Sequence, residues 1–127
     1  MPITTLTLLV LAPLFLFLSF KTIQARTKKK ISLGHGNDDT LQKMIRAHAN
    51  FTEYVPFILL LILLAEYRQM PRFFLVFLGG LLILGRYIHA YHFHTNQSGH
   101  ILRILGMVLT LTTCICGALG LLASFFY

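Results

Sequence analysis

Four stretches of apolar residues dominate the sequence and limit what the chain can fold into. A helix that spans a membrane needs about 20 mostly apolar residues. Three of the stretches approach or exceed this length, and the second reaches it when extended back through the more polar residues 41–54. The stretches cover residues 3–20, 55–65, 73–90 and 101–126. We therefore predict an all-α integral membrane protein, a single domain built as a four-transmembrane-helix bundle. The expected helices cover residues 3–25, 41–67, 72–94 and 100–126.

The composition argues against an ordinary soluble domain and against disorder. Of the 127 residues, 56% are hydrophobic and 12% are charged, whereas soluble domains carry about 25% charged residues. Disorder requires low hydrophobicity and high charge. No Lys or Arg precedes the first apolar stretch, and no small-residue cleavage pattern follows it, so we expect a retained helix rather than a signal peptide. Cys114 and Cys116 form no CxxC pair and are expected to face lipid or a neighbouring helix.

The surplus of positive charge lies mostly at one place. The formal net charge is +7, and seven of the eleven basic residues fall between Lys21 and Arg46. The opposite loop holds only Arg68 and Arg72. The positive-inside rule therefore predicts first and third loops in the cytoplasm and both termini on the other side, for which a bacterial inner membrane is the expected location. The basic run at residues 28–30 is expected to contact membrane lipids rather than nucleic acid, for which no motif is present.

The second expected helix carries charges where a membrane helix should have none. Arg46, Asn50 and Glu53 fall within about 60° of one another on one helix face, and Tyr54 flanks them. An embedded Arg or Glu costs at least ~2.5 kcal/mol. One interpretation is an Arg46–Glu53 pair that neutralises itself near the headgroups. The other is a polar pocket for a small zwitterion, in which Arg46 binds a carboxylate and Glu53 binds an ammonium group.

Two further groups allow either a structural or a functional interpretation. Tyr87 and Tyr91 are spaced i, i+4 and therefore share a helix face. They could belong to an aromatic belt at the membrane interface or could line the same pocket. Arg103, near the start of the fourth helix, could reach outward to the interface, or inward to lower the pKa of a thiol.

The histidines suggest a metal site only weakly. His89 and His92 are spaced i, i+3 and could share a metal with His35, while His94 diverges from His92 on a helix. No Cys or carboxylate is placed to complete such a site, so we predict no metal.

The second-helix segment RAHANFTEYVPFILLLILLAE, residues 46–66, resembles the hallmark segment of the MAPEG family, the membrane-associated proteins in eicosanoid and glutathione metabolism. The family pattern is R-x-x-x-N-x-x-E/D, followed here by Tyr-Val-Pro. The segment GRYIHAYHFH, residues 85–94, is similar to the third-helix ending of the family's bacterial branch. RILGM, which starts at Arg103, is similar to that branch's fourth-helix opening. The resemblance covers nearly the whole chain.

The resemblance implies a homotrimer of four-helix bundles, with glutathione bound in a horseshoe conformation between adjacent protomers near the cytosolic helix ends. Arg103 matches the arginine that activates the glutathione thiol, although the loop before it is longer here. The implied glutathione contacts are Arg46, His48, Asn50, Glu53, Tyr54, Tyr87 and Tyr91. Arg26 is a further candidate contact, but Thr27 follows it where the eukaryotic leukotriene synthases have a second arginine. The third-helix arginine is Arg86, two positions later than the family's, which corresponds to Leu84.

These observations predict a membrane-bound glutathione transferase. Glutathione would be the cosubstrate, and its thiolate would attack an apolar electrophile that arrives from the bilayer. This conjugation would serve detoxification, and the protein could also have glutathione peroxidase activity on lipid hydroperoxides. Two alternatives stay open, a non-catalytic glutathione- or lipid-binding membrane protein and a small multidrug or cation exporter. A small exporter should have its essential acidic residue in an otherwise apolar first helix, whereas Glu53 lies in the second helix.

Overall fold

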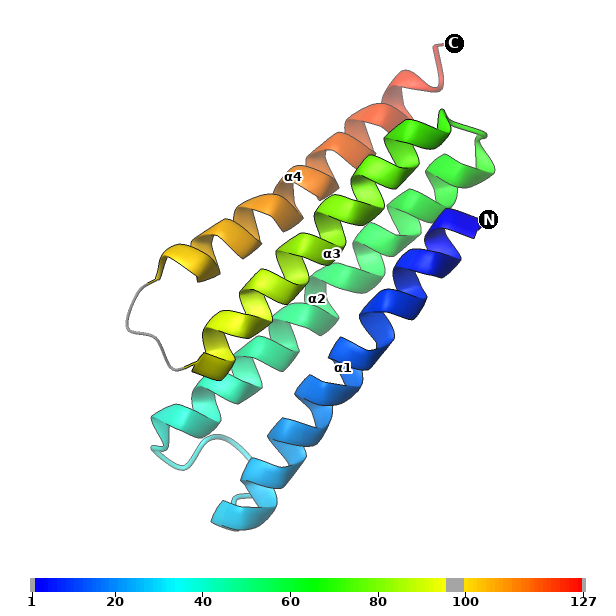
Figure 1. Cartoon of the computed structure of the whole chain (residues 1–127). Coiled ribbons are helices and arrows are strands. Elements are labelled where there is room, and N and C mark those ends of the chain that lie inside the picture. Colours follow the sequence, from blue (N-terminus) through cyan, green and yellow to red (C-terminus); the bar gives the residue numbers. More distant parts are fainter. Residues whose placement is uncertain (1, 96–99, 127) are drawn as a thin grey trace.

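The computed structural model describes residues 2–95 and 100–126 of the chain. These residues form four helices and no strand, which confirms the predicted all-α fold (Figure 1). The helices are α1 (Pro2–Lys29), α2 (Asp39–Tyr67), α3 (Arg72–Thr95) and α4 (Ile101–Ala123). Each is long and apolar enough to cross a membrane. The chain is therefore an integral membrane protein of four helices.

Some helix ends differ from the expected ones. Helix α1 continues to Lys29, four residues beyond its expected end at residue 25, and its last turn is basic. Cations are favourable at the negative end of a helix dipole. Helix α4 ends at Ala123, three residues before its expected end at residue 126.

Asp38 fixes the start of α2. Its carboxylate accepts the backbone N–H of Leu41 over 2.7 Å, which satisfies one of the unpaired first-turn amides of the helix. The same carboxylate forms an ion pair with Lys29 at the end of α1. The hydrogen bond from Lys29, followed by that from Leu41, lowers the pKa of Asp38 below its ordinary value. One side chain thus joins the two helix ends that the first loop connects.

The helices run up and down in turn, so both described chain ends lie at one end of the bundle (Figure 1). Helices α3 and α4 pack most extensively, α1 packs on α2 and α3, and no contact joins α1 to α4 within the described residues. Loop 30–38 and the start of α4 lie at the opposite end of the bundle. The basic run at residues 28–30 is therefore at the same end as Arg103.

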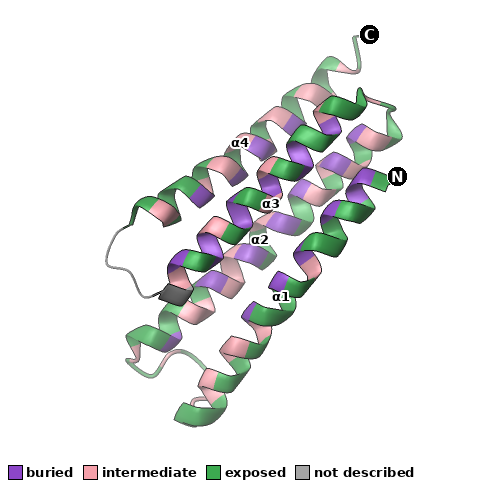
Figure 2. Cartoon of the chain, in the orientation of Figure 1, coloured by how far each residue is buried: buried purple, intermediate pink, exposed green. Residues whose placement is uncertain are grey.

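Buried residues lie where the helices face one another, and exposed residues lie on the outside of the bundle (Figure 2). The core is apolar, and many of the exposed side chains are also large and apolar. Lipid is as apolar as a leucine side chain, so outward apolar residues are expected of a membrane bundle. The main core includes Leu11, Leu14, Leu18, Phe51, Ile58, Leu78 and Leu82. Cys114 and Cys116 are half-buried and pack against this core.

Helices α3 and α4 approach each other closely at two glycines. A Cβ atom at Gly106 would lie 2.8 Å from the carbonyl oxygen of Gly85 and 2.8 Å from the Cβ of His89. Small residues of this kind let helix backbones approach in membranes. The contact brings Arg86, next to Gly85, against the backbone of α4.

Candidate functional site

A polar cavity of about 370 Å³ lies between α2, α3 and α4. It opens near the bundle end that carries loop 30–38, because its lining comes from the first turns of α2 and α4 and the last turns of α3. Three residues predicted from the sequence, Arg46, Asn50 and Arg103, meet here although 50 or more residues separate the first two from the third. The lining residues are Gln42, Lys43, Arg46, Asn50, His89, Phe93, Arg103 and Met107.

The charge of this cavity has one sign. Lys43, Arg46 and Arg103 are basic, and no carboxylate is among its lining residues. Arginine suits carboxylates through paired hydrogen bonds, and any ammonium or guanidinium group attracts anions. The cavity is therefore suited to a ligand with more than one anionic group.

Arg86 lies beside the cavity and is buried, with 2% of its surface exposed. Its Nη1 donates to Asn50 Oδ1 over 2.7 Å, and its Nη2 donates to Thr110 Oγ1 over 2.5 Å. Among the described residues Arg86 forms no ion pair with an acidic side chain. We noted Arg86 in the sequence only because it lies two positions later than the third-helix arginine of the family. The sequence does carry a signal for it, because a charge within an apolar stretch usually faces the bundle interior.

Glu53 and Tyr54 lie outside the polar cavity in one protomer. The Glu53 side chain is exposed and has no hydrogen-bond or ion-pair partner among the described residues. The self-neutralising Arg46–Glu53 pair, one of the two interpretations of this helix, is therefore wrong for the protomer. The two residues lie two helical turns apart, about 10 Å along the axis of α2. Arg46 lines the polar cavity together with Arg103, and Glu53 does not. Tyr54 is half-buried and packs against the core.

His48 and Arg26 make contacts within the protomer instead of reaching the cavity. His48 Nε2 lies 3.0 Å from Ser19 Oγ, and its ring packs on Phe15 with the ring centroids 5.6 Å apart. Arg26 donates to three carbonyl oxygens of the first loop, of which that of Gly34 is nearest at 3.0 Å. His48 thus joins α1 to α2, and Arg26 holds the first loop.

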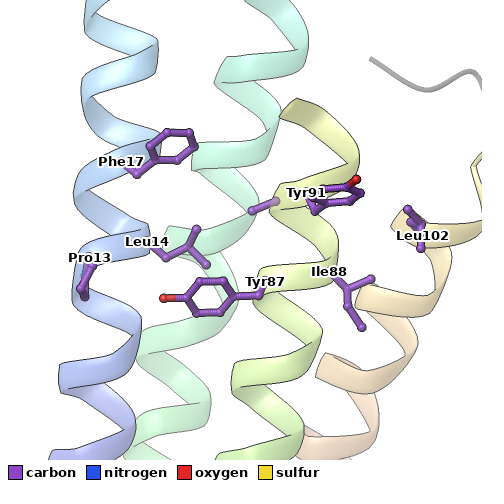
Figure 3. Close-up of a pocket in the computed structure, with 8 residues that line it drawn as sticks. Pro13, Leu14, Phe17, Tyr87, Ile88, Tyr91 and Leu102 are labelled. Atoms are coloured by element: carbon purple, nitrogen blue, oxygen red, sulfur yellow. The ribbon is translucent and has the colours of Figure 1, made fainter. Parts of the chain in front are cut away.

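Tyr87 and Tyr91 line a second cavity, of about 570 Å³ and mostly apolar, between α1, α3 and the start of α4 (Figure 3). The hydroxyl of Tyr87 donates to the carbonyl oxygen of Val10 over 3.0 Å. The two tyrosines therefore share a face of α3, as predicted, but this face is not the one that carries His89. The other lining residues are Pro13, Leu14, Phe17, Ile88, Ala90 and Leu102.

The histidines of α3 are partly inside the bundle. His89 and His92 are buried, and the ring of His92 lies 6.5 Å from that of His100. Residues 2–95 and 100–126 contain no group of three or more His, Cys, Asp or Glu that could hold a metal ion. The His94 side chain lies outside the described part of the structure.

Comparison with known proteins gives one family and two curated relatives. The model of the MAPEG family matches residues 4–123. The inner membrane protein YecN of Escherichia coli strain K12 is 32% identical over 83 residues, which are 65% of this chain and 63% of the relative. YecN of Escherichia coli O6:H1 strain CFT073 matches with the same identity and coverage. The match thus spans less than two thirds of the length of these relatives.

Proposed function

Because this chain belongs to the MAPEG family, we propose that it is a membrane-bound glutathione transferase. The family predicted from the second-helix motif is confirmed by the match over residues 4–123. The observation that carries the proposal is the polar cavity, which brings Arg46, Asn50 and Arg103 together and presents cations without a carboxylate. Glutathione has two carboxylates and a thiol that is most reactive as an anion, and these groups suit such a lining.

The proposed reaction assigns a role to each basic residue. Arg46 and Lys43 bind the glutathione carboxylates. Arg103 lies beside the thiol and lowers the thiol pKa from its free value of about 8.5, which raises the thiolate fraction at neutral pH. The thiolate then forms a carbon–sulfur bond with the electrophile, and the leaving group departs with the electron pair of the bond that breaks. The protein supplies orientation and charge stabilisation.

Glu53 supports an assembly in which a second protomer completes the site. An exposed carboxylate on a membrane-spanning helix costs at least ~2.5 kcal/mol, and neither the cavity nor its own protomer offers Glu53 a cation. A homotrimer with glutathione between protomers would bring the glutathione ammonium to Glu53. In this proposal Tyr54, His48 and Arg26 contribute to the same interface, and Tyr87 and Tyr91 lie near the electrophile.

The apolar cavity supports the choice of electrophile. Its lining is formed by aliphatic and aromatic side chains, and its Tyr87 and Tyr91 are exposed at the surface of the bundle, so an apolar molecule could enter it from the bilayer. Apolar electrophiles are the proposed substrates. A lipid hydroperoxide is a second candidate, since two glutathione thiols can reduce it to an alcohol and water while they form glutathione disulfide.

The proposed membrane is the bacterial inner membrane, with the first and third loops in the cytoplasm. The name of the relative YecN supports this location. The basic run at residues 28–30 supports the orientation through the positive-inside rule. In this orientation the polar cavity opens toward the cytosol, the compartment that holds glutathione.

The proposal is tested with the full chain purified in detergent. Saturating millimolar glutathione should raise the melting temperature, because a ligand that binds only the folded state stabilises it. Glutathione should then be conjugated to an aryl halide. Arg46→Ala should remove most of the stabilisation, whereas Arg72→Ala, at the other end of the bundle, should keep it. A melting temperature unchanged by glutathione would overturn the proposal. Stabilisation without conjugation would instead favour a non-catalytic glutathione-binding protein.

A further inference from the structure

We infer that Arg86 is a positioning residue of the polar cavity, which holds the Asn50 amide so that its nitrogen, and not its oxygen, faces the ligand. The inference rests on the proposed function, because it names the chemistry that the cavity presents to glutathione. Arg86 is not among the residues that line the polar cavity.

The hydrogen-bond pattern fixes which way the Asn50 amide points. A guanidinium group can only donate hydrogen bonds, and Arg86 Nη1 lies 2.7 Å from Asn50 Oδ1. The oxygen must therefore be the amide atom that faces Arg86. The amide nitrogen has no hydrogen-bond partner among the described residues. The buried side-chain nitrogens without a partner there are Arg86 Nε and His92 Nδ1, so the Asn50 nitrogen is accessible. Asn50 lines the polar cavity, and its N–H groups are thus available to a ligand.

Arg86 is held too firmly to reach the ligand itself. Its Nη2 donates to the Thr110 hydroxyl and lies 3.5 Å from the Gly106 carbonyl oxygen. The close approach of α3 and α4 at Gly85 and Gly106 places the α4 backbone against the Arg86 side chain. With 2% of its surface exposed, Arg86 can influence the cavity contents through Asn50 but cannot contact them.

The orientation of Asn50 has a chemical consequence for the ligand. With the amide oxygen occupied, Asn50 adds two N–H donors to a lining that already carries Lys43, Arg46 and Arg103. The ligand group opposite Asn50 must then be a hydrogen-bond acceptor, such as a carboxylate oxygen or a thiolate sulfur. An amide free to turn could present its oxygen to that acceptor, which would weaken binding. Arg86 therefore selects for a hydrogen-bond acceptor at this position.

A double-mutant cycle on glutathione affinity tests this role in the detergent-purified full chain. The variants are Asn50→Ala, Arg86→Leu and the pair together. Each single change should weaken binding about tenfold, the effect of one hydrogen bond to a charged group. Because Arg86 acts through Asn50, the pair should also lose about tenfold rather than a hundredfold. Arg72→Leu removes an arginine from the start of the same helix and should leave affinity unchanged.

Folding of the Arg86→Leu variant is expected, because the hydrogen-bond partners Asn50 and Thr110 are neutral and the change leaves no unpaired buried charge. A spectroscopic measurement separates positioning from a purely structural role. The chain has three asparagines, Asn37, Asn50 and Asn96, so selective ¹⁵N-asparagine labelling gives three side-chain amide signals, and Asn50→Ala identifies one of them. Glutathione should shift the Asn50 signal in the wild type but not in Arg86→Leu.

The outcomes distinguish the two proposals. Additive losses in the cycle, or an Asn50 signal that glutathione shifts equally in both proteins, would overturn the role of Arg86 alone. A wild-type chain that binds no glutathione would overturn the proposed function and this inference together.

Discussion

Thr4 and Glu66 join the first turn of α1 to the last turn of α2. The Thr4 hydroxyl donates to Glu66 Oε2 over 2.6 Å, and the Thr4 backbone N–H donates to the same oxygen over 3.0 Å. The other carboxylate oxygen accepts the backbone N–H of Ile3 over 2.9 Å. First-turn amides have no partner within their own helix and carry partial positive charge. A carboxylate from α2 thus does the work of an N-cap for α1.

We expect Glu66→Ala to destabilise the fold by about 2 kcal/mol, because it leaves two helix amides and one hydroxyl without their acceptor. Thermal or denaturant unfolding in detergent measures the change. Thr4→Val is the matched control, since it removes the hydroxyl alone and should cost about 1 kcal/mol. A Glu66→Ala protein as stable as the wild type would show that this contact does not hold α1.

We expect Gly106→Ala to destabilise the chain by about 1–3 kcal/mol, because the added methyl group would overlap the backbone of Gly85 and separate α3 from α4. The same change should weaken glutathione binding by displacing the acceptors of Arg86. Gly80→Ala is the control, since a Cβ there meets no atom within 4 Å, and alanine favours the helix by about 1 kcal/mol. Equal melting temperatures for the two variants would contradict the close approach of α3 and α4.

Arg103→Ala should lower the conjugation rate more than glutathione affinity. Without the cation the pKa of the bound thiol rises toward its free value of about 8.5. Each pKa unit of this rise lowers the thiolate fraction about tenfold while the pH is below the pKa. The rate should therefore fall at neutral pH and recover as the pH increases. The pH–rate profile checks this, with Arg103→Lys as the variant that keeps the charge. A profile unchanged in Arg103→Ala would remove Arg103 from the mechanism.

Glu53→Gln should abolish discrimination between glutathione and N-acetylglutathione, which lacks the ammonium group. The wild type should prefer glutathione by about tenfold, because a charge-assisted hydrogen bond is lost with the acetylated ligand. Isothermal titration with both ligands measures the preference. Glu66→Gln is the matched control from the same helix and should keep it. A Glu53→Gln protein with the wild-type preference would exclude Glu53 as the ammonium site.

Asp38 should make the junction of α1 and α2 sensitive to acid. Its pKa in the folded chain lies below the ordinary value of 3.8, first because Lys29 donates to it and then because of the Leu41 N–H. Its contribution to stability is therefore complete above that ordinary value and is lost as the pH falls through the lower, folded value. The melting-temperature difference between wild type and Asp38→Ala should be constant near neutral pH and shrink below about pH 4. A difference independent of pH would contradict the charged contact.

Much of the site followed from helical spacing along one segment. The i, i+4 and i, i+7 relation of Arg46, Asn50 and Glu53 predicted a shared polar face, and the structure places Arg46 and Asn50 on one cavity. It also places Tyr87 and Tyr91 together. The spacing could not show that the tyrosines face a separate apolar cavity, or that Glu53 lies outside the polar cavity, because these outcomes depend on where neighbouring helices lie.

The sequence by itself determined the four helices and the end of the bundle that collects positive charge, since apolar length and charge position are local properties of the chain. Only the tertiary structure decided the partners of the buried charge. Arg86 meets Asn50 and Thr110 because Gly85 and Gly106 let α3 and α4 approach. That contact joins residues 36 and 24 positions apart in the chain, and helical periodicity does not reach across such separations. Packing between helices therefore decides which atom of Asn50 a ligand would meet.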